Sequence, residues 1–319
     1  MIELSILVPS HNRARSLERC LRSALASHAD TIEVIVCDNA SPDDTPAVVA
    51  SFHDPRLRSL RNETNIGMAR NFLHILRTAQ GKWVFYLTDD DYLLPGAIEK
   101  LLPVLRAHDD VGLFLSPLRI VKDDRSVLPD YRFSERSGRF AAGADALLHL
   151  TAATHVLSRI TLRREWIDLA GTERHLGSDY PQTYMAGSVI RDHPGYYLDE
   201  VLVAHTTDNQ TFWDYTPDMM VASRLRLFDD MLPGPQWIKE RLALRNQLIA
   251  SIVRSHFKVT WKKGQWLAHQ RTLQRIPEVR HSLIYWRGLV RFLLKKARRG
   301  AKAKIRGWFN TAKTPPATP

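Results

Sequence analysis

The sequence predicts an α/β fold, a doubly wound and mostly parallel β-sheet flanked by helices, with a C-terminal helical extension. Short apolar runs rich in β-branched residues alternate with amphipathic helical patterns through the first hundred of the 319 residues. These runs are almost continuously apolar, which is typical of parallel strands that are covered on both faces. From about residue 217 the pattern is helical, apart from a Pro-Thr-Ala coil at 314–319.

Four apolar runs predict the strands of the first half. Polar, turn-forming residues follow each run, so each strand should end with its run. Alternating strands and helices imply right-handed crossovers and an open sheet. The runs are residues 4–9, 32–38 and 83–88, with a weaker one at 57–62.

Three helical patterns, residues 15–26, 44–52 and 67–79, separate these runs. In the first and third, apolar residues recur on one face, as in a helix that covers a sheet. The predicted inward-facing residues are Leu17, Cys20, Leu21 and Ala24 in the first, and Met68, Phe72, Ile75 and Leu76 in the third.

The second half gives weaker signals, and residues 122–140 form a polar connection that predicts no regular structure. We expect a domain at 1–215, made of two parts at 1–120 and 121–215, and a helical extension at 216–319. The remaining predictions are a strand or strand pair at 111–121, a helix at 144–154, a strand leading into a helix at 156–167, and one strand at 195–206.

The net charge of +11 belongs to the C-terminal tail. Eleven Lys and Arg residues follow Glu278 with no acidic residue among them, so the preceding chain has 34 cations and 34 anions. The neutral body, which lacks a recognisable binding module, argues against nucleic acid as a partner. The only cysteines are Cys20 and Cys37, and Cys37 lies in an apolar run, which favours a reducing compartment over a disulfide framework.

The chain has the pattern of a cytoplasmic protein. Its first residues include an acidic one and become polar within ten positions, unlike a signal peptide. No stretch approaches the roughly 18 uninterrupted apolar residues that a membrane span needs.

Polar loops follow every predicted strand of the first half. They are residues 9–13, 38–44, 62–71 and 88–91. In doubly wound sheets, ligands bind at the carboxyl ends of the strands, so these loops mark the expected site. Any one loop is better explained as a turn or helix cap, but four together favour a binding edge.

Asp89, Asp90 and Asp91 directly follow an apolar strand. Adjacent buried carboxylates repel one another, so a nearby cation is expected. Mg²⁺ or Mn²⁺ takes one or two protein carboxylates and completes its shell with water and phosphate oxygens. The alternative is a solvated acidic start to the helix that follows Pro95.

Four segments, in this order and spacing, resemble the nucleotide-binding half of family 2 inverting glycosyltransferases, which have the GT-A fold. The resemblance covers roughly residues 3–120 well and 150–210 loosely. The segments are SILVPSHNRARSLERCLRSAL, VIVCDNASPDDT, NIGMARN and VFYLTDDDYLLP.

The resemblance implies that 1–120 is the nucleotide-binding half and 121–215 the acceptor half, and it implies where the nucleotide binds. The loop after the first strand cradles it, Asp38 accepts a hydrogen bond from the base, commonly uracil N3–H, and the segment 65–71 contacts base and ribose. The implied nucleotide-binding residues are Pro9, Ser10, Asn12, Arg13, Asp38, Asn65, Gly67, Arg70 and Asp89.

The resemblance also implies a divalent metal, Mn²⁺ or Mg²⁺, on the Asp triplet. In the family's Asp-X-Asp element the first acid contacts ribose and the last binds the ion. Thr88 stands at the usual place of the first acid, so Asp90 is the expected ligand, with Asp89 or Asp91 beside it. His205 ends the last strand and is implied to reach the ion or the diphosphate. The expected metal ligands are Asp90, Asp91 and His205.

An inverting transfer needs a carboxylate that takes the proton of the attacking hydroxyl. The resemblance assigns this role to Asp179 in LGSDYPQ, where Ser178 replaces the usual first acid. The alternative is a helix N-cap. His155 and Trp213 are candidates for contacting the acceptor.

The tail at 280–313 predicts a basic amphipathic helix. Cations fill one side and apolar residues the other, a pattern that suits the surface of an anionic membrane. A helix packed on the body with a solvated basic face explains the pattern as well. The membrane alternative would place the protein on the inner face of the cell membrane.

These observations predict a metal-dependent inverting glycosyltransferase of the bacterial polysaccharide-biosynthesis type. It would move a sugar from a nucleoside-diphosphate sugar, most often a UDP-sugar, to a glycan or lipid-linked acceptor. The alternative is a non-catalytic protein of the same fold that binds nucleotide sugars or glycans. A nicotinamide-dependent oxidoreductase is disfavoured because PSHNRA replaces the G-x-G-x-x-G turn after the first strand.

Overall fold

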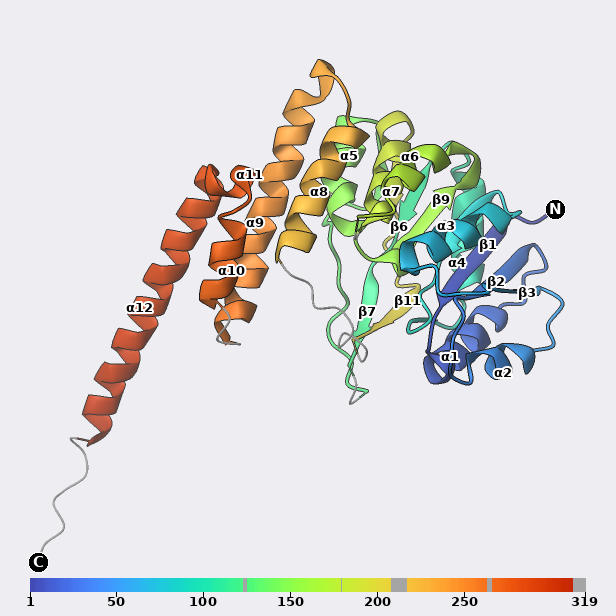
Figure 1. The fold of residues 1–319 in the computed structure, drawn as a ribbon, viewed down its shortest axis with the longest axis horizontal. Helices are drawn as coiled ribbons and strands as arrows, with labels where there is room; N and C mark the ends of the chain where they lie inside the picture. Colours follow the sequence, from blue (N-terminus) through green and yellow to red (C-terminus); the bar gives the residue numbers. More distant parts are fainter. Residues whose placement is uncertain (123–124, 179, 208–216, 263–265, 312–319) are drawn as a thin grey trace, which may run out of the picture. The chain divides into compact units, whose positions relative to one another are not determined.

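The structure is a computed structural model with two compact units (Figure 1). The sheet unit comprises residues 1–215 and 223–244, and the helical unit comprises 216–222 and 245–319. The structure describes the chain except for residues 123–124, 179, 208–216, 263–265 and 312–319.

An eight-stranded sheet forms the centre of the sheet unit, with the strand order β3-β2-β1-β4-β9-β6-β10-β8. The first four strands are parallel, and β9 is antiparallel to both of its neighbours. This confirms the α/β class and the mostly parallel sheet. The strands are β1 (Leu4–Ser10), β2 (Ile32–Asp38), β3 (Leu57–Arg61), β4 (Trp83–Tyr86), β6 (Leu113–Leu115), β8 (Gly138–Phe140), β9 (Ile160–Arg163) and β10 (Gly195–Tyr197).

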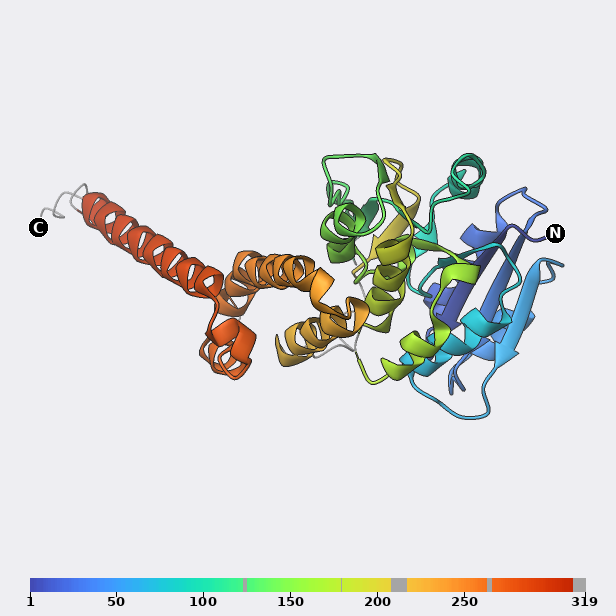
Figure 2. The same ribbon diagram turned by 90° about the horizontal axis from the view of Figure 1, so that it is seen from above.

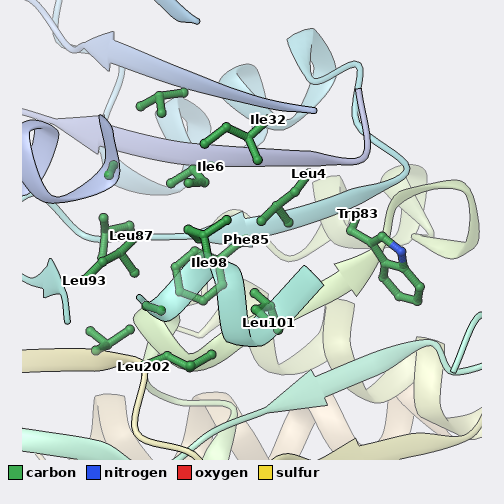
Figure 3. Packing of buried hydrophobic residues seen from close by; sticks show 14 of the residues in the cluster. Leu4, Ile6, Ile32, Trp83, Phe85, Leu87, Leu93, Ile98, Leu101 and Leu202 are labelled. Carbon is green, nitrogen blue, oxygen red and sulfur yellow. The ribbon is translucent and has the colours of Figure 1, made fainter. Parts of the chain in front are cut away.

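Alternation along β1 divides the core between the two faces of the sheet. Leu4 and Ile6 belong to the cluster that joins the sheet to α1 and α4, part of which is drawn in Figure 3. On the other face, Phe72 of α3 stacks on Tyr86 of β4 at a ring distance of 4.2 Å. The helices of this half are α1 (Ala14–Leu25), α2 (Thr45–Ala50), α3 (Met68–Thr78) and α4 (Ala97–Ala107).

Most of the predicted inward-facing helix residues are buried. All four named in α1 are in the core, as are Phe72, Ile75 and Leu76 in α3. Met68 is the exception, with 41% of its surface exposed, because it begins α3 next to the loop at the sheet edge.

A second sheet of three strands has the order β5-β11-β7. The single strand predicted at 195–206 is wrong, because this stretch supplies β10 to the large sheet and β11 to the small one. The exposed residues Asp199 and Glu200 interrupt its apolar pattern between them. The pair predicted at 111–121 is found as β6 and β7. The strands of the small sheet are β5 (Tyr92–Leu93), β7 (Leu118–Val121) and β11 (Val203–Thr206).

Short helices complete the rest of the sheet unit. The predicted strand-then-helix at 156–167 is instead a 3-10 turn, β9 and a second 3-10 turn, η3 (Arg164–Trp166). Ten of the twelve residues of α7 are buried, so this helix lies in the core. The other elements are α5 (Ala144–Leu150), η1 (Thr151–Ala153), η2 (Leu157–Arg159), α6 (Leu169–Arg174) and α7 (Pro181–Asp192).

The C-terminal part of the chain is helical, as predicted. Figure 2 shows α12 as a long red helix, and Tyr285 and Leu289 form its buried face. No helix among the described residues is long and apolar enough to cross a membrane. The elements are α8 (Pro217–Met231), η5 (Pro235–Trp237), α9 (Ile238–Lys262), α10 (Trp266–Leu273), α11 (Pro277–Arg280) and α12 (Leu283–Thr311).

The stacking of Phe72 on Tyr86 predicts a large cost for Phe72→Ala. We expect the free energy of unfolding to fall by about 3–5 kcal/mol, because the truncation leaves a cavity beneath α3. Urea denaturation followed by circular dichroism measures the change. Met68→Ala, on the exposed start of the same helix, is the control and should change stability by no more than about 0.5 kcal/mol. Equal effects of the two substitutions would contradict this packing.

Candidate active site

The ends of β1, β2 and β4 meet at one edge of the sheet because these strands are parallel. Ser10 and Asp38, the last residues of β1 and β2, are direct partners in the register. The Asp triplet follows β4 on the other side of β1. The backbone is left-handed just beyond two of these ends, at Asn12 (φ 56°) and Ala40 (φ 57°). Such conformations cost about 1 kcal/mol or more outside glycine and concentrate at functional sites.

Asp38 is buried at this edge of the sheet, with 3% of its surface exposed. Its Oδ2 accepts from Arg61 Nη1 at 2.5 Å, and its Oδ1 accepts from the Ser41 backbone N–H at 2.9 Å. A carboxylate has about four acceptor sites, so these bonds leave capacity for a further donor. The predicted contact with a nucleotide base stays a prediction.

An amide network joins the loops after β2 and β3. Asn39 Nδ2 donates to Asn65 Oδ1 at 2.8 Å, and Asn62 Nδ2 donates to both Asn39 and Asn71. The backbone N–H of Gly67 also donates to Asn65 Oδ1. The structure thus ties two of the predicted nucleotide-binding residues, Asn65 and Gly67, to the end of β2.

Asp89 and Asp90 face the loop that follows β1. Ser10 Oγ donates to Asp89 Oδ2 at 2.8 Å, and Arg13 Nη1 donates to Asp90 Oδ2 at 2.8 Å. Arg13 Nε lies 3.8 Å from Asp89 Oδ1. The structure therefore brings together two predicted residues from the first loop and two from the triplet.

One arginine does not neutralise this pair. Burial, together with the charge of Asp90, raises the pKa of Asp89 to about 7, although Arg13 and the Ser10 hydroxyl act in the opposite direction. The pKa of Asp90 is also raised, by burial and then by Asp91. The site thus holds more negative charge than its own residues compensate.

Asp91 points into the protein and is fully buried. Its Oδ1 accepts from the Thr206 backbone N–H at 2.9 Å, and its Oδ2 accepts from Thr88 Oγ1 at 2.9 Å. His205 Nδ1 lies 3.0 Å from Oδ2. Burial lowers the pKa of His205, but the hydrogen bond to Asp91 and the negative charges of Asp91 and Asp90 together outweigh it, so the pKa is raised. Asp91 therefore anchors the triplet to β11.

A divalent cation fits the outer two carboxylates. The side chains of Asp89 and Asp90 are 11% and 20% exposed, whereas that of Asp91 is fully covered. No group of three or more His, Cys, Asp or Glu side chains in the described part of the chain could hold an ion by itself. Mg²⁺ or Mn²⁺ would therefore depend on phosphate oxygens, as such ions usually do. The predicted metal roles of Asp90, Asp91 and His205 stay predictions.

The remaining predicted residues are more dispersed. Pro9 lies within β1, and Arg70 is exposed on α3 without a described partner. His155 is half-buried, and burial, followed by the charge of Arg224, lowers its pKa to about 4. His155 is thus neutral at physiological pH.

Two predicted residues, Asp179 and Trp213, lie outside the described residues. Ser178, which precedes Asp179, is described, and its Oγ accepts from the Tyr180 backbone N–H at 3.2 Å. The sequence position of Asp179 is thus two residues before α7 begins.

Sequence reasoning missed two residues that complete the edge. Arg61 pairs with Asp38, and Ser158 Oγ accepts from the Thr88 backbone N–H at 3.0 Å. Arg61 ends an apolar run in the sequence, which is a signal that could have found it. Ser158 has no such signal, because it lies seventy positions from its partner.

The comparison with protein families decides the classification. Residues 5–168, about half of the chain, match the model "Glycosyl transferase family 2". This protein belongs to glycosyltransferase family 2. The enzyme class predicted from the sequence, a glycosyltransferase, is thus confirmed at the level of the family.

Relatives in this family include proteins of polysaccharide synthesis. The succinoglycan biosynthesis protein ExoO of Rhizobium meliloti is 33% identical over 100 residues, which cover 31% of this chain and 29% of ExoO. Two further relatives are likewise matched over less than half of their own length, 40% of one and 39% of the other.

Two solved structures share the fold. S. aureus TarS 1-349 in complex with UDP-GlcNAc has a TM-score of 0.62 at 17% identity, with 86% of this chain and 82% of that chain covered. The mannosyltransferase PcManGT of Pyrobaculum calidifontis, in complex with GDP-Man and Mn²⁺, has a TM-score of 0.58 at 18% identity, with 96% and 82% covered. This likeness confirms the predicted GT-A fold.

Because Asp89 lies at the edge of the sheet and Asp91 points into the protein, substitutions at these two positions should have opposite effects on stability. Asp89→Asn should stabilise the ligand-free protein above neutral pH, because it removes a buried carboxylate whose pKa is raised. A pKa of about 7 in place of 3.8 corresponds to at most about 4 kcal/mol. Asp91→Asn should cost about 1–3 kcal/mol, because Thr206, Thr88 and His205 lose charged hydrogen-bond partners.

Urea denaturation in EDTA between pH 4 and pH 8 measures both effects. The carboxyl of Asp89 is protonated in both states below about pH 4, so wild type loses stability relative to Asp89→Asn as the pH rises toward 7. An Asp89→Asn protein less stable than wild type at pH 7.5 would refute the electrostatic account.

Proposed function

We propose that this protein is a metal-dependent inverting glycosyltransferase of surface polysaccharide synthesis. It transfers a sugar from a nucleoside-diphosphate sugar, most often a UDP-sugar, to a glycan or lipid-linked acceptor. The observation that carries the proposal is the set of contacts from Ser10 and Arg13 to Asp89 and Asp90. The description of ExoO as a succinoglycan biosynthesis protein supports the pathway, and the UDP-GlcNAc in TarS supports the donor class.

The donor lies across the ends of β1, β2 and β4 in this proposal. Asp38 and Asn65 hold the base, and Asp89 holds the ribose. Asp90, facing outward, would hold Mn²⁺ or Mg²⁺ together with the diphosphate, and a bound ion would supply positive charge to offset the charge of the leaving nucleoside diphosphate. The Arg13 guanidinium turns from Asp90 toward a phosphate oxygen, which is an equally good acceptor for it.

Asp179 takes the proton of the acceptor hydroxyl as its oxygen attacks the anomeric carbon. The attack comes from the face opposite the diphosphate, so the configuration at that carbon inverts. His155 is neutral at physiological pH, and with Trp213 it contacts the acceptor. The second candidate function, binding without transfer, is favoured by one observation, that Ser178 replaces the first member of the acidic pair.

Donor binding tests the proposal through thermal stability. UDP-sugars and GDP-sugars are screened with Mn²⁺ and with EDTA, and a bound donor should raise the unfolding midpoint by several degrees. Asp90→Asn should lose the Mn²⁺-dependent part of the shift. Glu18→Gln, on the exposed face of α1, is the matched acidic control and should retain it. A wild-type protein that no nucleotide sugar stabilises, with or without Mn²⁺, would refute the proposal.

The base is tested in the same series. Asp179→Asn should bind donor as wild type does, and should lower the rate of transfer or donor hydrolysis by about 10²–10⁴-fold. Donor binding by wild type without any turnover would instead support the non-catalytic alternative.

The exposed side of α12 supports a further proposal, that this helix lies on an anionic membrane surface. Arg287, Arg291 and Lys295 recur at intervals of four along α12, so they lie beside the apolar stripe and apart from the buried Tyr285. Each cation near an anionic surface contributes about 1 kcal/mol. Five apolar side chains between 39% and 70% exposed form the stripe, Leu283, Trp286, Val290, Leu293 and Leu294.

Vesicle co-sedimentation tests this placement. The protein should bind vesicles containing phosphatidylglycerol and should bind pure phosphatidylcholine at least tenfold more weakly. Val290→Asp combined with Leu294→Asp should abolish binding, because charge cannot enter the acyl region at that depth. Leu242→Asp, an exposed apolar position on α9, should bind as wild type does. Equal binding of both variants would contradict the assignment of α12.

A further inference from the structure

Arg159 carries a buried positive charge that no carboxylate in the described part of the chain contacts. It ends η2, directly before β9, with 1% of its surface exposed. Its Nε and Nη1 have no hydrogen-bond partner, and its Nη2 donates to the Tyr131 carbonyl at the long distance of 3.5 Å. The rings of Tyr131 and Phe133 lie 5.0 Å from the guanidinium carbon. These rings provide cation–π contacts but no counter-charge.

The charge persists at physiological pH. Burial lowers the pKa of Arg159 to about 10, which still leaves the guanidinium protonated. Buried charges in proteins are paired or hydrogen-bonded, because an uncompensated one is strongly destabilising. Arg163, at the other end of β9, follows this rule and pairs with Asp109 and Glu165. No carboxylate among the described residues compensates Arg159, and an anionic ligand is the partner that we test for here.

A second buried donor follows the strand that pairs with β9. Ser116 is 3% exposed, and its Oγ has no hydrogen-bond partner among the described residues. Leu115 and Ile160 are the last paired residues of β6 and β9, and Ser116 and Arg159 are the next residues beyond them. Continuing this antiparallel register by one position would place the two residues opposite each other, on one face. A guanidinium fork and a hydroxyl on one face have the chemistry that binds phosphate or carboxylate oxygens.

The position of this pair indicates which substrate carries the anion. The preceding residue, Ser158, bonds to Thr88 at the Asp triplet, so Arg159 lies beside the candidate active site. The strand order places β9 and β6 on one side of β4, and β1 and β2 on the other. The loops expected to hold the nucleotide follow β1 and β2. The anion near Arg159 therefore lies on the side left for the acceptor.

We propose that Arg159 and Ser116 bind an oxyanion, a phosphate or a carboxylate, of the acceptor. The assignment of this anion to the acceptor rests on the proposed function, whereas the anion site itself rests on the unpaired guanidinium. Entry requires the rings of Tyr131 and Phe133 to move aside. Tyr131 is 45% exposed. A hollow of about 400 Å³, lined in part by Phe133, brings solvent to these two rings, which cover Arg159. The same hollow carries Glu135 and Asp199, so it is a route and not the anion site.

The thermal unfolding midpoint, measured with inorganic phosphate or glucuronate and with chloride at equal ionic strength, tests the anion site. Both oxyanions should raise the wild-type midpoint by several degrees through linkage. Arg159→Met should weaken their apparent affinity by about 10- to 100-fold, the loss expected for charged hydrogen bonds. Arg163→Met, which removes a paired arginine from the same strand, should retain wild-type affinity.

The unfolding midpoints without ligand show whether each variant folds as stably as wild type. Arg159→Met without ligand should unfold at or above the wild-type midpoint, because it removes an unpaired buried charge. A midpoint well below wild type would show that Arg159 already has a partner in the chain and would overturn the proposal. Ser116→Ala is the milder variant and should weaken oxyanion binding several-fold. Oxyanion shifts that are identical in wild type, Arg159→Met and Ser116→Ala would also overturn it.

A second arm separates the acceptor from the donor. UDP and GDP affinities are measured with Mn²⁺ for wild type and Arg159→Met, and the proposal expects them to be equal. A tenfold or greater loss in the variant would assign the oxyanion to the donor diphosphate and overturn the acceptor assignment. If wild type binds no nucleotide while phosphate or glucuronate still acts through Arg159, the proposed function fails and the anion site stands.

Discussion

Three carboxylates on consecutive residues at the end of a buried strand cannot all be hydrated, and this constraint shapes the site. The structure divides them. Asp91 turns inward, where the Thr206 N–H, Thr88 and His205 satisfy it, and this fastens the small sheet to the end of β4. Asp89 and Asp90 remain at the edge with more charge than one arginine offsets. Structural anchoring and the excess negative charge at the edge thus come from the same three residues.

The sequence predicted the fold well where each element produces its own signal. Buried parallel strands need continuous apolar runs, and the helices that cover them need an apolar stripe, so the first 110 residues were interpretable one element at a time. The stretch at 195–206 was not, because its two short strands pair in different sheets and only the distant partners decide that. The polar connection at 122–140 gave no signal for β8, which is three residues long and sits at the sheet edge.

The candidate site divides in the same way. Parallel strands bring their carboxyl ends to one edge, so the loops containing Arg13, Asp38 and Asp90 were predictable as neighbours. The direction in which each side chain points was not predictable from the sequence. Nothing in the triplet says that its third member faces inward, since this follows from where β11 runs. In the sequence Arg159 is one of several arginines around a strand, and it is distinguished only by its burial without a counter-ion among the described residues.

The hydrogen bonds between Thr88 and Ser158 join the two halves of the sheet unit at the point where donor and acceptor would meet. A chimera that joined the chain up to the triplet to the second part of a relative would have to keep this contact. The junction of such a chimera would separate Thr88 from Ser158, two residues with hydroxyl groups. A graft that supplied an apolar residue at position 158 would leave the Thr88 N–H unsatisfied one residue before the triplet. Compatibility of fused halves in this architecture is therefore set by one serine as well as by the fit of the two cores.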